Sequence, residues 1–295
     1  MNRENEMYGA LAVVAAALGM DFVSGQALAA FYAQTGRAGW LGIALSMLLF
    51  GLAVGAIAHA ARRCGAQNVG ELLSRLPGGG VGRGALLLYG CILLLAAGML
   101  VTSAGHMCAL AVPVRHADLL GGALALLAAA VLAFAGKCMM KAVGGALALM
   151  MLVLEAALLL FADLPDTPRY AIELRLQGNY PAALIFAALH TAAGICLSAG
   201  LAVRFADGRC RAVRLGSRAG LVYGLLLGLG NAVLMTEDVR ILGLQLPFVA
   251  LCADWGNAGF YLNAALSWMF CVFSLAGLIC GLLPSRNHSK NDVKL

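Results

Sequence analysis

The sequence predicts an all-α polytopic membrane protein of about eight transmembrane helices, and the composition, the apolar segments and the placement of basic residues all indicate this class. Of the 295 residues, 62% are hydrophobic and 12% are charged, and the mean hydropathy is +0.89. A soluble domain of this length has no use for so much apolar surface. A helix that crosses the hydrocarbon layer, in contrast, needs about 20 apolar residues.

Apolar stretches of this length occur eight times along the chain. They cover residues 8–35, 38–61, 84–111, 118–136, 141–162, 179–206, 215–236 and 257–283. The first stretch is too long for the apolar part of a signal peptide and meets no cleavage site, so we expect it to remain as the first span.

Basic residues divide unevenly between the two sides of these eight spans. Of the 20 Lys and Arg residues, only Arg37, Arg115, Arg169, Arg175 and Arg240 fall on the second side. Because short cytoplasmic loops carry the excess of basic residues, both termini are expected in the cytoplasm. The net charge of +6 then reflects topology, and no nucleic-acid partner is indicated.

Three connecting segments carry their own patterns. NVGELLSRL places Val69, Leu72, Leu73 and Leu76 on one face, which predicts a short amphipathic helix on the membrane surface. The PGGGVGRG stretch that follows lacks the Gly-Lys-Ser/Thr of a phosphate-binding loop and is expected to be a flexible turn. The alternating segment 169–176 is expected to be extended, and 237–256 to lie along the mouth of the protein without crossing it.

Neither metal nor catalytic chemistry is indicated. The nine cysteines are scattered and contain no C-x-x-C pair, so no disulfide framework, zinc site or cofactor is expected. Ser, His and Asp occur at no catalytic spacing, and we expect a protein that is not an enzyme.

Glycines recur at four-residue intervals in three spans. They are Gly51 and Gly55 in the second span, Gly216, Gly220, Gly224 and Gly228 in the seventh, and Gly277 and Gly281 in the eighth. Small residues at this spacing let helices approach closely in lipid. Packing within one chain and packing in a homodimer both remain open.

Polar residues inside the apolar spans are the candidates for function. Asp21, Glu155, His106 and His190 lie at mid-membrane, where a charged side chain costs about 2.5–3.5 kcal/mol on insertion scales. For each histidine a hydrogen-bonded packing role competes with a functional one. Asp21 differs because Gly19 and Gly25 beside it predict an interruption of the helix, which membranes tolerate only where it is buried or lines a cavity.

The sixth span offers a second interruption near residues 190–196. It holds ALHTAAGICLSAG, with His190, Thr191 and Gly194. Spans one and six run in opposite directions, so halves that begin with them would be inverted repeats. Interrupted helices in corresponding positions of two such halves are typical of a transporter binding site.

The stretch GMDFVSGQALAAFYAQTGRAGWLGIALSMLLFGL, from Gly19 to Leu52, resembles the opening of the YkvI-like bacterial membrane proteins of the amino acid–polyamine–organocation superfamily. The resemblance implies a LeuT-like inverted repeat. Residues 8–162 would be the first five-helix repeat, 179–283 a truncated three-helix second repeat and 284–295 a cytoplasmic tail, all within one membrane domain, 1–295. It also implies a cation site between spans one and eight at Gly19, the Phe22 backbone and Ser274. Gln26 and Phe273 depart from the family pattern.

Together these features predict a secondary-transporter-like protein that binds an amino acid or amine between broken spans one and six. Backbone N–H groups of Val23, Ser24 and Gly25 would bind a carboxylate, Asp21 would bind an ammonium group, and His190, Thr191 and Gly194 would complete the site. Glu155, His190 and His106 are candidates for coupling to H+, and the site between spans one and eight is the candidate for Na+. Alternatively, Asp21 only caps the outer half-helix.

A non-transporting sensor, or a subunit of a membrane complex on the same scaffold, is the alternative function. Besides the lipid bilayer and a small solute, the partners expected are a second copy of the chain or a subunit that replaces the helices missing from the second repeat.

Overall fold

The computed structural model describes residues 3–75, 79–161, 178–206, 209–236 and 239–283, and over these ranges it is helical, with no β-strand. Eight of the described helices are long and apolar enough to cross a membrane. They are α1 (Arg3–Val23), α3 (Ala38–Cys64), α5 (Gly79–Ala111), α6 (Ala117–Phe134), α7 (Lys137–Leu160), α9 (Tyr180–Arg204), α10 (Arg209–Thr236) and α13 (Asn257–Leu282). The all-α class and the eight candidate spans are thus confirmed.

The first span departs most from its predicted bounds, 8–35. The chain forms α1, then the short helix α2 (Gln26–Phe31) and a 3₁₀ turn, η1 (Ala33–Thr35). Gly25 separates the two helices with a φ of 83°, a left-handed conformation that glycine adopts without steric cost. The apolar run therefore continues through a turn that hydropathy alone does not reveal.

The connecting segments follow local sequence signals. In α4 (Val69–Ser74), the Asn68 side chain accepts the Glu71 N–H at 2.7 Å, and Glu71 accepts the Gln67 N–H at 2.9 Å. This reciprocal cap confirms the short helix. Between α10 and α13, the chain forms α11 (Val239–Leu242) and α12 (Pro247–Ala253), and neither crosses the bundle.

The structure differs from one loop prediction and does not describe the segment of another. The glycine-rich stretch expected to be a turn is helical from Gly79 onward, as the start of α5. The low helix propensity of its glycines does not prevent a helix here. The extended segment 169–176 and the tail 284–295 lie outside the described residues.

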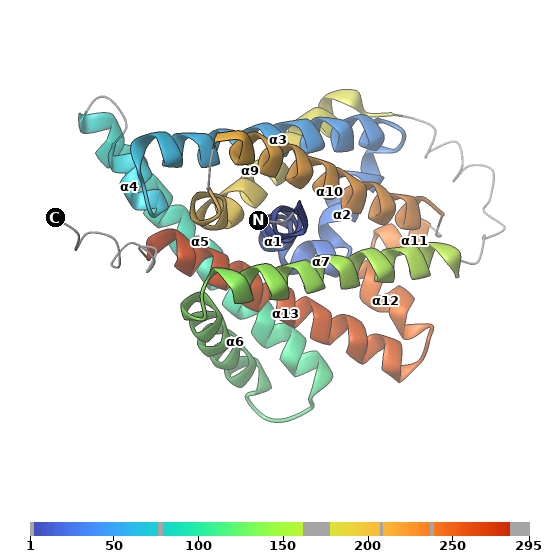
Figure 1. Cartoon of the computed structure of the whole chain (residues 1–295). Helices are drawn as coiled ribbons and strands as arrows, with labels where there is room; N and C mark the ends of the chain where they lie inside the picture. Colours follow the sequence, from blue (N-terminus) through green and yellow to red (C-terminus); the bar gives the residue numbers. More distant parts are fainter. Residues whose placement is uncertain (1–2, 76–78, 162–177, 207–208, 237–238, 284–295) are drawn as a thin grey trace.

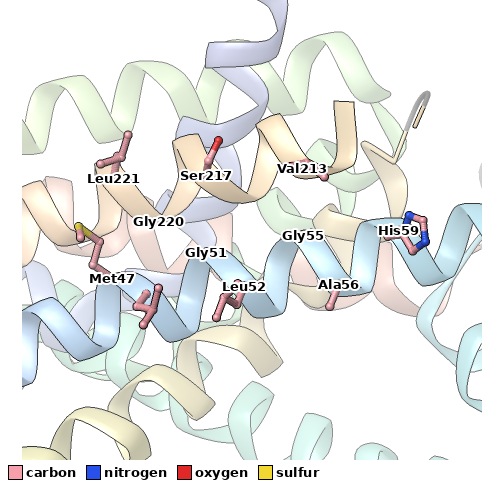
Figure 2. Close-up of a pocket in the computed structure, with 11 residues that line it drawn as sticks. Met47, Gly51, Leu52, Gly55, Ala56, His59, Val213, Ser217, Gly220 and Leu221 are labelled. Atoms are coloured by element: carbon pink, nitrogen blue, oxygen red, sulfur yellow. The ribbon is translucent and has the colours of Figure 1, made fainter. Parts of the chain in front are cut away.

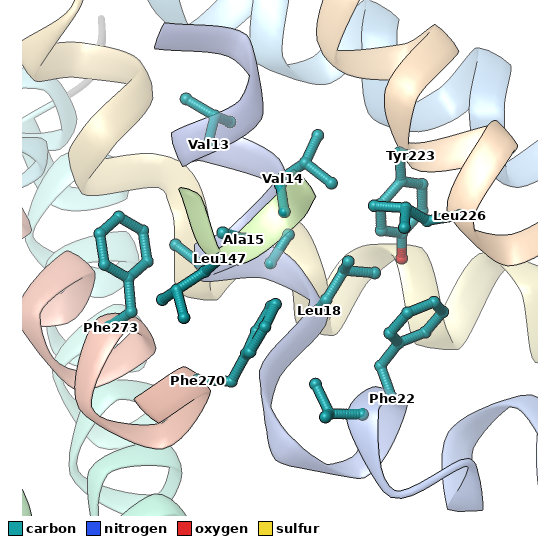
Figure 3. Packing of buried hydrophobic residues seen from close by; sticks show 14 of the residues in the cluster. Val13, Val14, Ala15, Leu18, Phe22, Leu147, Tyr223, Leu226, Phe270 and Phe273 are labelled. Atoms are coloured by element: carbon teal, nitrogen blue, oxygen red, sulfur yellow. The ribbon is translucent and has the colours of Figure 1, made fainter. Parts of the chain in front are cut away.

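Helix α1 lies in the middle of the bundle (Figure 1). In that view α3 and α10 pass on one side of α1 and α7 and α13 on the other, with α11 and α12 at one end of the molecule and α4 at the opposite end. Within α1, every residue from Ala10 to Leu18 is buried. Figure 3 shows Phe270 and Phe273 of α13 and Leu226 of α10 closing on this central helix.

Helices α3 and α10 cross through their glycines. A Cβ atom placed on Gly216 would lie 2.5 Å from the Gly51 carbonyl oxygen, and one on Gly220 would lie 3.0 Å from the Gly51 Cα. Helices α9 and α13 meet in the same way, because a Cβ on Gly200 would lie 2.6 Å from the Gly281 Cα. These glycines therefore pack helices within one chain, where backbones touch directly.

We expect Gly216→Ala to destabilise the protein by about 1–3 kcal/mol, because the added methyl group has no room against α3. The measurement is the thermal unfolding midpoint of the purified protein in detergent. Gly98→Ala is the matched control, since a Cβ there meets nothing within 4 Å and alanine favours a helix. Equal unfolding midpoints for the two variants would contradict the close crossing.

Candidate functional site

The backbone of α1 leaves helical geometry at Gly19, where φ is 63° and ψ is −173°. This position lies in the region 19–25 where the sequence places an interruption. After it, the Ser24 N–H donates to the Met20 carbonyl and the Gly25 N–H to the Phe22 carbonyl, both at 2.9 Å. The backbone therefore kinks at Gly19 inside α1 and turns at Ser24 and Gly25 into α2. Residues 19–25, called the α1 turn below, lie in the centre of the bundle.

Neighbouring helices supply hydrogen bonds to the carbonyl groups around this turn. Asn263 of α13 donates its amide to the Val23 carbonyl at 3.2 Å, and Ser274 of α13 donates its hydroxyl to the Ala16 carbonyl at 3.0 Å. From α12, the Phe248 N–H donates to the Ser24 carbonyl at 2.8 Å. Since lipid offers no donors, these bonds make the interruption tolerable.

Asp21 is the exposed side chain of the turn. Phe22, Val23 and Ser24 are each 0% exposed, whereas Asp21 is classed as exposed. Within the described part of the chain, no hydrogen bond or ion pair to its carboxylate is found. Asp21 also does not cap α2, because the N-cap residue is Gly25 and the side chain that accepts the Gln26 N–H, at 3.5 Å, is that of Ser24. The capping alternative is therefore wrong, and the carboxylate is available to a ligand.

The predicted carboxylate-binding site is not formed at two of its three positions. The N–H groups of Ser24 and Gly25 already donate to carbonyls of the same turn, and Val23 ends α1. The sequence predicted an unwound segment with free N–H groups. In the structure the segment forms a turn, and the N–H groups of Ser24 and Gly25 bond to carbonyl groups within it. The segment thus presents an anion and offers neither of these donors.

The interruption predicted in the sixth span is absent, and this prediction is wrong. Helix α9 runs as a helix from Tyr180 to Arg204, through the whole region 190–196. Gly194 serves close packing: a Cβ there would lie 3.3 Å from the Ala17 carbonyl of α1. A glycine that lets two helices touch and a glycine that breaks a helix have the same sequence signal.

His190 belongs to a buried cluster of hydroxyl groups. Its Nδ1 atom lies 2.9 Å from the Tyr32 hydroxyl and 3.1 Å from the Tyr223 hydroxyl, and Ser46 Oγ lies 2.8 Å from the Tyr32 hydroxyl. Thr191 is also buried, at 1% exposure. The cluster joins α3, α9 and α10 to the end of α2. The structure thus favours the hydrogen-bonded packing role for this histidine.

The remaining candidates do not gather at one place. Gly19 and Ser274 do approach each other, since a Cβ on Gly19 would lie 4.0 Å from Ser274 Oγ. The Ser274 hydroxyl and the Phe22 carbonyl are, however, both engaged in hydrogen bonds. His106 is exposed on α5 and does not join the turn, and Glu155 is buried on α7 facing Gly230 of α10.

Several residues around the turn were not predicted from the sequence. Asn263 and Ser267 of α13 form a pair, with the Ser267 hydroxyl donating to the Asn263 side chain at 3.3 Å. An amide inside an apolar span is a usable signal, because it needs a partner in lipid. Tyr32 and Tyr223 gave no such signal, since tyrosine is common at any buried position.

A groove of about 610 Å³ lies between α3 and α10 (Figure 2). Its walls are mainly apolar, with Leu52 and Leu221 among the exposed residues at its edges. None of the predicted site residues lines it. The groove is therefore separate from the Asp21 turn, and its apolar walls suit lipid better than a polar solute.

Comparisons with known proteins identify no relative, so the functional conclusion rests on the geometry of the site. No family model matches the chain, and no curated protein matches it. Among the described residues, no group of three or more His, Cys, Asp or Glu side chains could hold a metal ion.

We expect Tyr32→Phe and Tyr223→Phe to be non-additive, because both hydroxyls bond to the same His190 nitrogen. Each single variant leaves one bond to Nδ1 and should cost about 0.6 kcal/mol, the average for such bonds in membranes. The double variant leaves the nitrogen without either and should cost more than the sum. A double-mutant cycle on unfolding free energies measures this, and strict additivity would contradict the shared acceptor.

Proposed function

We propose that the protein is a secondary transporter that binds the ammonium group of a small organic solute at Asp21. The observation that carries the proposal is an exposed carboxylate on an interruption of the most central helix. The structure has eight helices that are long and apolar enough to cross a membrane. The transport function proposed for them rests on this one site.

The position of the interruption supports a binding site. Of the eight candidate spans, α1 has the largest buried share and α13 the second largest. Non-helical backbone at membrane depth is found where it is enclosed by protein or lines a cavity, and discontinuous helices near the middle of a bundle mark solute sites in transporters. The turn 19–25 has this placement and is bonded to both α12 and α13.

The hydrogen bonds of the turn support an amine as the class of solute. Asp21 offers a negative charge, whereas the Ser24 and Gly25 N–H groups are occupied. An amine, or an amino acid bound through its ammonium group, therefore suits the site better than a solute recognised through a carboxylate. A carboxylate left at membrane depth without a partner is costly, so cation binding there is favoured.

The partners of the site differ from those first expected. Because α9 is continuous, the solute cannot bind between two broken helices. We propose that it binds between the α1 turn and α13, next to α12. The interruption in the first span and the packing of α1 against α13 support the amino acid–polyamine–organocation-like arrangement that the sequence resemblance implies. The uneven distribution of basic residues supports an orientation with both termini in the cytoplasm, and the sequence resemblance supports a bacterial inner membrane as its location.

Asp21→Asn should weaken amine binding at least tenfold, or about 1.4 kcal/mol, because the amide keeps the shape of the side chain and loses its charge. Binding is measured by ligand-dependent thermal stabilisation with a panel of labelled amines and amino acids, and transport by their uptake into proteoliposomes. Asp254→Asn, which removes a carboxylate from the end of α12, is the matched control.

The outcomes separate the possible functions. Uptake by the wild type that Asp21→Asn lacks and Asp254→Asn keeps supports the transporter. Saturable binding without uptake identifies a sensor on the same scaffold. A wild-type ligand response that Asp21→Asn leaves unchanged would remove Asp21 from the site.

A further inference from the structure

Glu155 is a buried carboxyl group with no hydrogen-bond partner. It lies in the last third of α7 and is 0% exposed. Neither of its carboxyl oxygens has a partner among the described residues. A Cβ placed on Gly230 of α10 would lie 2.6 Å from Oε1, so the carboxyl group packs against bare helix backbone.

Two apolar side chains at this contact come from the segments that cover the α1 turn. A Cβ on Gly230 would also overlap Leu28 of α2 and would lie 3.4 Å from the ring of Phe248 on α12. Phe248 in turn packs on Gly25, where a Cβ would lie 2.9 Å from the ring, and its N–H bonds to the Ser24 carbonyl. Glu155 therefore lies directly beneath the junction of α2, α10 and α12.

Charged and titratable groups on the surrounding elements do not compensate the carboxyl group. On α10, Arg214 and Arg218 pair with Glu6 of α1, and Tyr223 bonds to His190. Helix α2 has no such group. The others described are Lys137, Cys138 and Lys141 on α7, Tyr8 and Asp21 on α1, Asp118 on α6, Cys252 on α12, and Tyr261, Cys271 and Cys280 on α13, and none gives Glu155 a hydrogen bond.

An ionised Glu155 would be an isolated charge in this environment. A buried charge without a partner is strongly destabilising, whereas a neutral acid loses only the hydration of a polar group. The arrangement seen here therefore requires the carboxyl group to hold a proton. Asn231, the next residue after Gly230, is also 0% exposed, and its amide has no partner among the described residues.

Separation of α2 and α12 from α10 would make the ionised form of Glu155 less unfavourable. Water would then reach the carboxyl group, and the O–H bond could break with the proton passing to water. Closure reverses the step: the carboxylate takes a proton from water, the O–H bond forms, and water is excluded. Because the closed form binds the proton more tightly, proton binding must in turn favour closure.

We propose that Glu155 is a proton-binding site whose occupancy closes α2 and α12 over the α1 turn. The inference that H+ is the coupling ion of transport rests on the proposed function. The proton site itself does not, since it follows from burial and from the contacts at Gly230.

Infrared difference spectroscopy of the full chain in lipid nanodiscs tests the site directly. At neutral pH the wild type should show the C=O stretching band of a protonated carboxylic acid, and Glu155→Gln should lack it. Asp254→Asn should keep the band. Carbon-13 labelling of glutamate in the wild type must shift the same band, which provides a test that needs no variant. A wild type without such a band at neutral pH would overturn the proposal.

Hydrogen exchange of the α12 peptide, 247–253, tests the link to closure. As pH rises, loss of the proton should open the wild type, so this peptide should exchange at least tenfold faster than in Glu155→Gln at the same alkaline pH. Comparison at equal pH cancels the intrinsic pH dependence of exchange. Equal rates in the two proteins would refute the coupling. Neither experiment uses a solute. A missing infrared band or equal exchange rates would therefore count against the proton site alone, and absent uptake would count against the transporter alone.

Discussion

The interruption of α1 at the centre of the bundle is the constraint on which the surrounding structure depends. Backbone groups that leave helical geometry inside a membrane find no partners in lipid, so the protein has to supply them. Here the turn satisfies two of its own N–H groups, and α12 and α13 bond to the carbonyls of Ser24, Val23 and Ala16. The contacts of α12 and α13 with α1 thus include the bonds that satisfy these carbonyl groups.

Close helix packing makes that arrangement possible. The central helix is rich in alanine along its buried stretch Ala10–Leu18, and the glycines of α3, α9, α10 and α13 bring backbones into direct contact. In lipid, helix association depends on such packing because burial of apolar side chains gains little. Gly230 extends the same principle to a polar group, since its missing side chain leaves the space that the Glu155 carboxyl group occupies.

Polar residues in the spans have three different fates in this fold. Asp21 is exposed on the turn, His190 bonds to Tyr32 and Tyr223, and Glu155 is buried with no hydrogen-bond partner among the described residues. The first suits a ligand, the second fixes helices to one another, and the third suits a proton. All three are polar residues within apolar spans, and their surroundings distinguish them.

The sequence by itself determined the class of the protein, the eight candidate spans, the short α4 helix and the location of the first interruption. These features depend on local signals: runs of apolar residues, a capping pair at Asn68 and Glu71, and two glycines around Asp21. Only the tertiary structure decided that α9 is continuous, that the Ser24 and Gly25 N–H groups are occupied, and which groups face Glu155. Each of these depends on contacts between residues far apart in the chain, and a glycine or histidine has the same appearance in a sequence whatever lies opposite it in the bundle.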